Sequence, residues 1–397
     1  MDLSLDRNHD ELRRRAREFC DREITPHIRA WDRAGNFPEG MVAKLAAEGF
    51  LGLCIPGSEG GRGEDFFALG LLCEELERAD TAFRVLLSVH LGLNSLALLQ
   101  WGGEEQKRRY LRPQARGEKL AAFGLTEPEA GSDVAALRCS ARREGDAYIL
   151  NGDKSWIGFA GAADHFLIFA RTGPGPGSSG LSAFILERGN PGLRTSSIGH
   201  KLGGRAGTTG GISLRDAAVP VKNRLGDEGD GFRIAMSALD NGRFTVAAGA
   251  VGLIEACLEA GASFARERQA FGRPIGRQQL VQQKIAEMAA GRDIGRLLWN
   301  KVAWLKNRGR RCTREVSLAK WINCRNAFAA ADAAVQIHGA RGYSDEYPVE
   351  RYLRNARGAR IYEGTEEIHQ VLQAEYALGY REDKPLKREP PGFGGDG

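Results

Sequence analysis

The spacing of apolar residues changes twice along the chain and divides it into three parts. In residues 1–122 apolar side chains recur every three or four positions, as at Val42 and Leu45, which predicts amphipathic helices. In residues 123–231 short apolar runs alternate with turn-forming residues, which predicts a small β domain. In residues 232–381 helical spacing returns over long stretches, which favours a bundle. The expected fold class is therefore α+β and mainly α.

Turn-forming residues subdivide the middle part. The pair Asn151-Gly152 follows the apolar run Tyr148–Leu150 and predicts a two-residue hairpin turn, with Lys154–Ile157 as the returning strand. Two further strands are expected at His165–Ala170 and Leu181–Leu186. Several short strands with frequent turns favour a barrel or a sandwich.

The composition is that of an ordinary globular protein. Of 397 residues, 42% are hydrophobic and 27% are charged, and the formal charge of +5 is spread along the chain, which gives no case for nucleic-acid binding. The seven cysteines form no Cys-x-x-Cys pair and have no histidine at metal-ligand spacing, so reduced buried thiols and no metal site are expected. The glycines between 203 and 211 lack the Rossmann and P-loop spacings, so a nucleotide would have to bind by another route.

Three stretches bear on where the protein resides. The N-terminal residues are polar and carry no signal peptide, which indicates the cytosol, or an organelle matrix in a eukaryote. Val85–Gly103 is uncharged but contains His90 and Asn94, so a buried helix is expected rather than a membrane span. The charged, Pro/Gly-rich tail 382–397 is expected to be disordered.

Two segments around the β part could contribute to a ligand site. Phe123–Asp133 is rich in hydroxyls and glycine and could offer donors to a planar ring or a phosphate, or could be a capped turn. Trp156, just past the predicted hairpin turn, could lay its flat face against an aromatic ring, or could be a core residue.

A third segment, Arg360–Thr365, places Glu363 between Tyr362 and Gly364. Glycine leaves room for a ligand to approach the backbone. A partly desolvated glutamate has a raised pKa, which suits proton abstraction near neutral pH. Helix capping by Thr365 explains the end of the segment, but it does not explain Tyr362 or Glu363.

Together with Glu267–Gly272 and Gln336–Tyr343, these segments resemble the acyl-CoA dehydrogenase family over about residues 6–381. The resemblance implies an N-terminal helical domain, a central β-barrel domain and a C-terminal four-helix bundle, which is the order that the apolar spacing predicts. It also implies FAD as cofactor, an electron-transfer flavoprotein as electron acceptor, and a homotetramer built as a dimer of dimers.

The resemblance implies a set of FAD-binding residues. Arg268, Phe271 and Gln336 would serve the FAD of a neighbouring subunit, although Arg268 could also be a surface charge that pairs with Glu267. At Gly158 many family members have a hydroxyl that bonds the flavin N5 edge, so only a backbone N–H remains here. The cofactor residues implied are Thr126, Ser132, Trp156, Gly158, Arg268, Phe271, Gln336 and Thr365.

By the same resemblance, Glu363 removes the proton from the thioester α-carbon while the flavin accepts a hydride from the β-carbon. Some family members carry the base at the position that is Gly242 here, where no carboxylate can act. The substrate contacts implied are Arg84, Ser88, Ser132, Asp240, Arg243 and Gly364. Asp240 could equally cap a helix start.

The substrate itself is open. Arg84 and Ser88 lie one helical turn apart, at positions similar to those that hold the distal carboxylate in the glutaryl-CoA dehydrogenase branch. Alternatively, Arg84 points to solvent or pairs with Asp80. The expected reaction is the oxidation of a short acyl-CoA, such as butyryl-CoA, to its trans-2-enoyl-CoA. The rivals are a glutaryl-CoA substrate, an acyl-carrier-protein substrate, a flavin oxidase on the same fold, and a non-catalytic scaffold.

Overall fold

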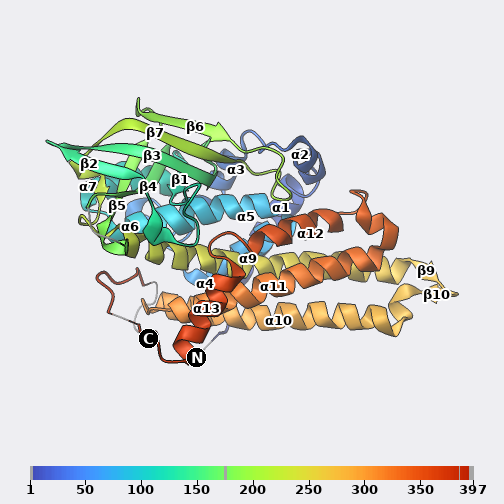
Figure 1. The fold of residues 1–397 in the computed structure, drawn as a ribbon. Coiled ribbons are helices and arrows are strands. Elements are labelled where there is room, and N and C mark those ends of the chain that lie inside the picture. Colours follow the sequence, from blue (N-terminus) through green and yellow to red (C-terminus); the bar gives the residue numbers. More distant parts are fainter. Residues whose placement is uncertain (1–2, 174–176, 384, 393–397) are drawn as a thin grey trace.

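The structure is a computed structural model, and it describes residues 3–173, 177–383 and 385–392. Figure 1 shows the strands gathered on one side of the molecule, the long C-terminal helices side by side on the other, and the N-terminal helices packed along both. This is the expected order of helical domain, β domain and helical bundle. The predicted fold class is therefore confirmed.

Short helices form the N-terminal part. They are α1 (Arg7–Glu23), α2 (Ile28–Ala34), α3 (Met41–Ala47), α4 (Phe66–Ala79), α5 (Thr81–Leu87), the π-helix η3 (Ser88–Ser95), α6 (Leu96–Trp101), α7 (Glu104–Gln106), the π-helix η4 (Lys107–Leu111) and α8 (Arg112–Ala115). Helix α1 begins where the Asp6 side chain accepts a hydrogen bond from the His9 backbone N–H. Its apolar side packs against α4, whereas Arg14 on its outer side pairs with Glu11 and Glu18.

Helices α5, η3 and α6 continue one another across the middle of the molecule. This stretch, Thr81–Trp101, and the later helix Gly231–Glu267 have the length and composition of membrane spans, but 89% and 78% of their most apolar windows are buried inside the protein. Within the described ranges this burial accounts for their apolar character, because core helices have no solvent-facing side.

The β domain is an eight-stranded sheet with the order β6-β7-β3-β2-β4-β5-β8, in which β1 pairs in parallel with β4. The strands are β1 (Ala121–Gly124), β2 (Ser140–Glu144), β3 (Ala147–Gly158), β4 (His165–Arg171), β5 (Leu181–Glu187), β6 (Leu193–Ser197), β7 (Thr209–Pro220) and β8 (Arg224–Leu225). The two strands expected after the hairpin correspond to β4 and β5, so that prediction is confirmed.

The predicted hairpin turn at Asn151-Gly152 is wrong. Strand β3 passes straight through this pair, and its pairing with β7 shifts register there, which marks a β-bulge. Gly152 has a φ of +146°, and a Cβ at this position would lie 2.8 Å from the Cys139 Cα on the neighbouring chain segment. The glycine therefore serves close backbone contact within the sheet, whereas the actual turn falls at Gly145, between β2 and β3.

The C-terminal part consists of α9 (Gly231–Glu267), α10 (Gln279–Asn307), α11 (Thr313–His338), α12 (Val349–Ala359) and α13 (Glu366–Ala377), with a small hairpin of β9 (Gln269–Ala270) and β10 (Arg273–Pro274). Helix α9 lies at the centre and packs against α4, η3, α10 and α11. Its contact with α4 is close because a Cβ on Gly252 would lie only 1.9 Å from the Glu74 carbonyl oxygen.

Candidate active site

A cavity of about 1160 Å³ lies where the three parts of the chain meet. Helices α5 and η3, the loop after β1, the end of β3, helix α9 and the segment before α13 all contribute to its wall. This volume exceeds that of a typical single-ligand pocket and leaves room for a cofactor beside a substrate. The predicted site residues that line it are Arg84, Thr126, Ser132, Trp156, Gly158, Asp240, Arg243, Glu363, Gly364 and Thr365.

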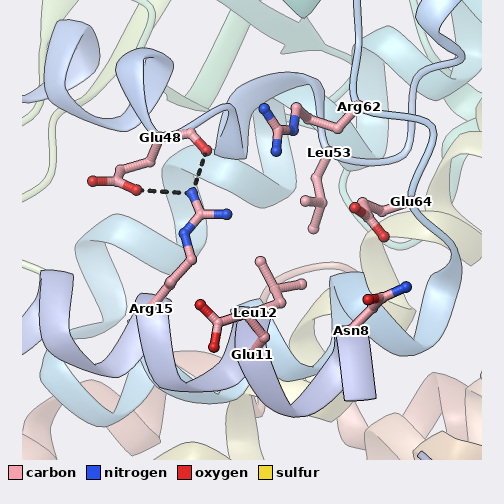
Figure 2. Close-up of a pocket in the computed structure, with 8 residues that line it drawn as sticks. All are labelled: Asn8, Glu11, Leu12, Arg15, Glu48, Leu53, Arg62 and Glu64. Atoms are coloured by element: carbon pink, nitrogen blue, oxygen red, sulfur yellow. Dashed lines mark hydrogen bonds and ion pairs between the residues drawn. The ribbon is translucent and has the colours of Figure 1, made fainter. Parts of the chain in front are cut away.

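A second, much smaller hollow lies on the surface between α1 and the segment that follows α3. Figure 2 shows its lining, in which Arg15 reaches across to Glu48. It has a volume of about 160 Å³ and is lined mainly by charged side chains that water can solvate. Such a hollow is typical of an ion-paired protein surface, so the cavity at Glu363 is the candidate active site.

The carboxylate of Glu363 is held at one side of the large cavity. Ser88 Oγ donates a hydrogen bond of 2.7 Å to Glu363 Oε1, whereas Oε2 has no hydrogen-bond partner among the described residues. Thr245 Oγ1 lies within hydrogen-bonding distance of Ser88 Oγ, at 2.7 Å, and helps to fix the position of the Ser88 hydroxyl. Burial raises the pKa of Glu363, and the positive charge of Arg84 opposes part of that rise. One carboxylate oxygen is therefore oriented by the protein, and the other is buried with no hydrogen bond from the described residues, so its lone pairs are not used within the protein, as a proton-abstracting base requires.

The raised pKa of Glu363 leads to a prediction about how the stability of the protein depends on pH. A carboxyl group whose folded-state pKa lies above its unfolded value stabilises the protein below the unfolded value, and this contribution is lost as the pH rises through the folded pKa. Glu363→Gln keeps the neutral shape at every pH. We expect its melting temperature to match that of the wild type in acid and to exceed it near neutral pH, measured on FAD-loaded protein. A difference that does not change with pH would contradict the assigned shift.

Gly242 on α9 makes room for this carboxylate. A Cβ on Gly242 would lie 2.0 Å from Glu363 Oε2 and 2.7 Å from Leu93 Cδ2. The glycine that leaves the alternative base position empty is thus also the residue that lets Glu363 occupy the space.

We therefore expect Gly242→Ala to lower the rate of flavin reduction by about 10²-fold, because a displacement of about 1 Å in a reacting group costs that much. The measurement is anaerobic flavin bleaching by an acyl-CoA, with FAD content determined in parallel. Gly261→Ala on the same helix is the matched control, since a Cβ there meets only ordinary contacts, the nearest at 3.4 Å. Equal rates in the two variants would contradict the steric role of Gly242.

The backbone beside the base is strained and is held by cationic side chains. Glu363 has a φ of +56° and Gly364 a φ of +102°. Lys320 Nζ donates to the Gly364 carbonyl oxygen at 2.6 Å, and Arg243 Nε donates to the Glu363 carbonyl oxygen at 3.3 Å. Asp240 in turn holds Arg243 through a 3.2 Å ion pair. These contacts stabilise a turn that a non-glycine residue rarely adopts.

Two placements in this region differ from the sequence analysis. Asp240 lies well inside α9, so its interpretation as a helix-start cap is wrong; its carboxylate instead accepts from Arg243 and Thr313. Lys320, which binds the Gly364 carbonyl, was missed. The sequence did contain an indication of its role. Lys320 is a charged residue on the side of α11 that is otherwise formed by small and apolar residues such as Val316, Ala319 and Ala327.

Arg84 is buried, so the alternatives that it points to solvent or pairs with Asp80 are both wrong. Its Nε donates to Glu77 Oε2 at 2.5 Å, and its Nη2 donates to the Tyr362 hydroxyl at 2.5 Å. Asp80 caps α5 through the Ala82 N–H and pairs with Arg351, so it is not available to Arg84. Arg84 Nη1 has no hydrogen-bond partner within the described part of the chain, although the side chain lines the cavity.

The part of the wall formed by the end of β3 and the loop after β1 offers the features that a flavin ring needs. Trp156 has a φ of +58° and is 63% exposed at the end of β3, so its interpretation as a core residue is wrong. The Thr126 carbonyl accepts from the Ser155 N–H, which places the loop after β1 beside Trp156. A Cβ on Gly158 would lie 3.2 Å from Val89 Cγ2, which accounts for a small residue there. An exposed indole face, a hydroxyl-bearing loop and the volume of the cavity together fit a planar cofactor.

Three of the predicted cofactor residues lie outside this cavity's lining. Phe271 is 93% exposed in the β9–β10 hairpin, at the far end of the bundle in Figure 1. Arg268 follows the end of α9 next to that hairpin, and Gln336 lies in the last turn of α11. Within the described part of the chain, the Glu267 carboxylate accepts a 3.0 Å hydrogen bond from the Ser263 hydroxyl and forms no ion pair with Arg268. A single chain therefore does not bring these residues to its own cavity, and their service to a neighbouring subunit stays a prediction.

The fold therefore combines a helical domain, a β domain and a helical bundle, and at their junction a buried carboxylate lines a cavity large enough for a cofactor beside a substrate. Models of the N-terminal, middle and C-terminal domains of acyl-CoA dehydrogenases match residues 6–118, 122–217 and 229–378. The chain belongs to the acyl-CoA dehydrogenase family, whose members are FAD-dependent oxidoreductases.

Individual relatives support this assignment. An acyl-CoA dehydrogenase of Bacillus subtilis is 41% identical over 93% of this chain and 97% of its own length. Butyryl-CoA dehydrogenase from Megasphaera elsdenii has a TM-score of 0.93 at 36% identity, covering 95% of this chain and all of its own. Glutaryl-CoA dehydrogenase in complex with glutaryl-CoA has a TM-score of 0.94 at 38% identity, covering 99% of this chain and all of its own.

Two further solved structures concern the cofactor and the electron acceptor. A glutaryl-CoA dehydrogenase from Mycobacterium smegmatis, 31% identical with a TM-score of 0.90 over 94% of this chain and 95% of its own, was solved with FADH2. FAD is accordingly the cofactor of this family, and the residues of the cavity wall fit it. A chain 39% identical, with a TM-score of 0.93 over 95% of this chain and all of its own, belongs to a structure concerning the electron transferring flavoprotein of Acidaminococcus fermentans.

Proposed function

We propose that this chain oxidises a short, unsubstituted acyl-CoA, such as butyryl-CoA, to its trans-2-enoyl-CoA, with Glu363 as the base. The observation that carries the proposal is the Glu363 carboxylate in the cavity wall, which accepts from Ser88 through one oxygen, whereas its other oxygen has no hydrogen-bond partner among the described residues. The relatives that act on short acyl-CoA thioesters support the choice of substrate class.

The residues around Glu363 perform the proton transfer. Oε2 takes the proton from the carbon next to the thioester carbonyl. The raised pKa of Glu363 makes its carboxylate a stronger base than an ordinary glutamate, which favours this proton transfer. The Glu363 backbone N–H, held in its orientation by Arg243 and Lys320 on the two adjacent carbonyls, donates to the thioester oxygen as negative charge develops there. Val85, Val89 and other apolar residues of the wall exclude water. When bound, FAD supplies the acceptor for the hydride that leaves the β-carbon.

The cofactor contacts belong to the same proposal. Thr126, Ser132, Trp156, Gly158 and Thr365 hold the flavin and its nearer phosphates in one subunit. The remaining contacts, from Arg268, Phe271 and Gln336, reach the FAD of a neighbour within a homotetramer. Arg268 suits this role because a guanidinium binds phosphate oxygens in pairs. An electron-transfer flavoprotein accepts the electrons, and the enzyme works in the cytoplasm; the structure concerning the Acidaminococcus flavoprotein supports the former.

A second candidate is the oxidation of glutaryl-CoA. It is favoured by Arg84 Nη1, a buried guanidinium nitrogen on the cavity wall that has no partner in the described residues. A distal carboxylate could complete its hydrogen bonding, with the Ser88 hydroxyl one turn away. However, Ser88 already donates to Glu363 and Arg84 already pairs with Glu77. The site therefore has fewer free hydrogen-bond donors for the distal carboxylate of the substrate than the sequence alone indicates.

A panel of acyl-CoA thioesters tests both candidates. The FAD-loaded protein is mixed anaerobically with butyryl-CoA, octanoyl-CoA or glutaryl-CoA, and the rate of flavin bleaching is compared by kcat/KM. The proposal expects butyryl-CoA to be the best substrate. Faster bleaching by glutaryl-CoA that is lost selectively in Ser88→Ala would establish the second candidate instead. No bleaching by any thioester, or peroxide formed in air at the rate of turnover, would contradict both.

A further inference from the structure

The C-terminal segment lies across the mouth of the active-site cavity. Pro385, Leu386, Lys387, Arg388 and Pro390 are among the residues that line it. The family's C-terminal model ends at residue 378, so this part of the wall lies beyond the residues that define the family match. The structure describes 382, 383 and 385–392 of this segment, and these residues form neither helix nor strand. The disorder expected for 382–397 stays a prediction; residues 384 and 393–397 lie outside the described part.

Lys387 attaches this segment to one side of the cavity mouth. Lys387 Nζ donates to Asp227 at 2.9 Å and to Asp230 at 2.6 Å, just before α9 begins. Asp230 is almost fully buried and also pairs with Arg233, another residue of the cavity wall, at 3.0 Å. The segment is therefore anchored where α9 leaves the β domain.

The next residue attaches the segment to the end of α6. The Arg388 carbonyl accepts from Gln100 Nε2 at 3.0 Å, and its Nη1 donates to the Trp101 carbonyl oxygen at 3.0 Å. The guanidinium also lies over the Trp101 ring, 5.6 Å from its centre. Both Gln100 and Trp101 line the same cavity.

The opposite side of the mouth is formed by the bundle. Asp383 accepts from the Tyr376 hydroxyl of α13 at 2.6 Å and pairs with Arg311, before α11, at 3.0 Å. The chain thus crosses from α13 and α11 to α6 and α9 within a few residues. The segment 385–390, which we call the strap, forms the outer wall of a cavity whose inner end is Glu363.

Cations concentrate at this mouth. Two of the lining cations, Lys387 and Arg388, belong to the strap itself. Two others pair with residues that hold the segment, Arg233 with Asp230 and Arg311 with Asp383, and Arg310 is adjacent to Arg311. Lys387 keeps its pair with the buried Asp230, whereas its pair with Asp227 and the pair of Arg311 with Asp383 are partly exposed. Partly exposed pairs contribute little to stability, so a phosphate can compete with Asp227 and Asp383 for these donors. Because the reacting carbon must reach Glu363, the nucleotide end of a CoA thioester lies toward this mouth.

We propose that the strap is part of the substrate site and that Lys387 and Arg388 bind the phosphates of the nucleotide end of the thioester. The inference rests on the proposed function, because it assumes a thioester that carries a nucleotide. The strap then selects for CoA over a carrier that lacks the nucleotide, and it acts on binding rather than on proton removal.

Lys387→Ala/Arg388→Ala tests this inference, with butyryl-CoA and butyryl-pantetheine as substrates. We expect KM for butyryl-CoA to rise about tenfold and to depend less on salt, with kcat unchanged, because charge-assisted contacts to phosphate are lost. KM for butyryl-pantetheine, which lacks the nucleotide phosphates, should stay the same. Arg142→Ala/Arg143→Ala on β2 is the matched control for net charge, and a chain ended after Arg381 tests the whole strap.

Each other result decides against the strap. An equal change in KM for the two thioesters would show a general loss of the wall, and no change for either would show that the strap does not bind substrate. A lower KM in the shortened chain would identify the strap as an obstruction. If butyryl-CoA does not bleach the wild-type flavin, the proposed reaction fails separately, and the dissociation constant of CoA itself, measured on the wild type and the double variant, still tests the phosphate contacts.

Discussion

Glu363→Gln is expected to lower the rate of anaerobic flavin reduction by an acyl-CoA about 10²–10⁴-fold while FAD stays bound. Glutamine keeps the shape of the side chain and can still accept the hydrogen bond from Ser88, but it cannot take a proton from the substrate. The measurement is stopped-flow bleaching of the flavin absorbance under anaerobic conditions, together with the FAD content and the dissociation constant of the product. Binding should change little, since the loss concerns only the reacting state.

Glu367→Gln is the matched control. This carboxylate is exposed in the first turn of α13, four residues from Glu363, and has no place in the cavity wall. Its variant should reduce at the wild-type rate. If Glu363→Gln retains more than about one tenth of the wild-type rate, the proton is removed by another group and the assignment of the base is wrong.

The three-part architecture could be predicted because it depends on local periodicity. Helical spacing in the first and last parts and short apolar runs in the middle part survive into the structure almost unchanged. The hairpin at Asn151-Gly152 could not be predicted correctly, because the same two residues suit a turn and a bulge. The choice between them is made by the neighbouring strands: β7 pairs with β3 on both sides of Gly152, and the Cys139 backbone leaves room only for glycine. Such information is not local in the sequence.

The candidate site divides in a similar way. Glu363 and Trp156 could be singled out from short motifs, because residue type and neighbours already limit their chemistry. The partners of Arg84 could not. Asp80 was the obvious acid at helical spacing, but it ends α4 and caps α5, so the helix break turns it away. Glu77 lies seven residues before Arg84 and reaches it because the two helices meet at an angle that the sequence does not reveal. Tyr362 comes from the other end of the chain.

This buried network links substrate chemistry to stability. Glu77 and Arg84 are 2% and 1% exposed, and the arginine lies close enough to Glu363 to lower the pKa of that carboxyl against the effect of burial. Gly249 on α9 provides the space, since a Cβ there would lie 3.0 Å from three atoms of the Arg84 side chain. The ion pair therefore sits between the core of the bundle and the base, and a change in it should be visible in both unfolding and pH dependence.

Arg84→Met is accordingly expected to lower the free energy of unfolding by about 3–5 kcal/mol, because it leaves the Glu77 carboxylate buried without its counter-charge. Glu77→Met should cost a similar amount for the converse reason. The double variant removes both charges and should recover most of the loss, so the two changes are far from additive. Urea unfolding of the FAD-loaded protein measures all three. Additive losses would show that the pair is not coupled.

The same double variant separates the electrostatic role of Arg84 from its structural role. Without the guanidinium, Glu363 keeps its burial but loses the positive charge that lowers its pKa most, so its pKa should rise further. The base is active only when ionised, and the pH at which flavin reduction reaches half of its maximal rate should therefore move upward in the folded double variant. Ser88→Ala removes a hydrogen bond from the same carboxylate and should shift this pH in the same direction, while the Arg84–Glu77 ion pair stays intact. A pH profile that stays in place in both variants would show that neither Arg84 nor Ser88 stabilises the charged form of the base.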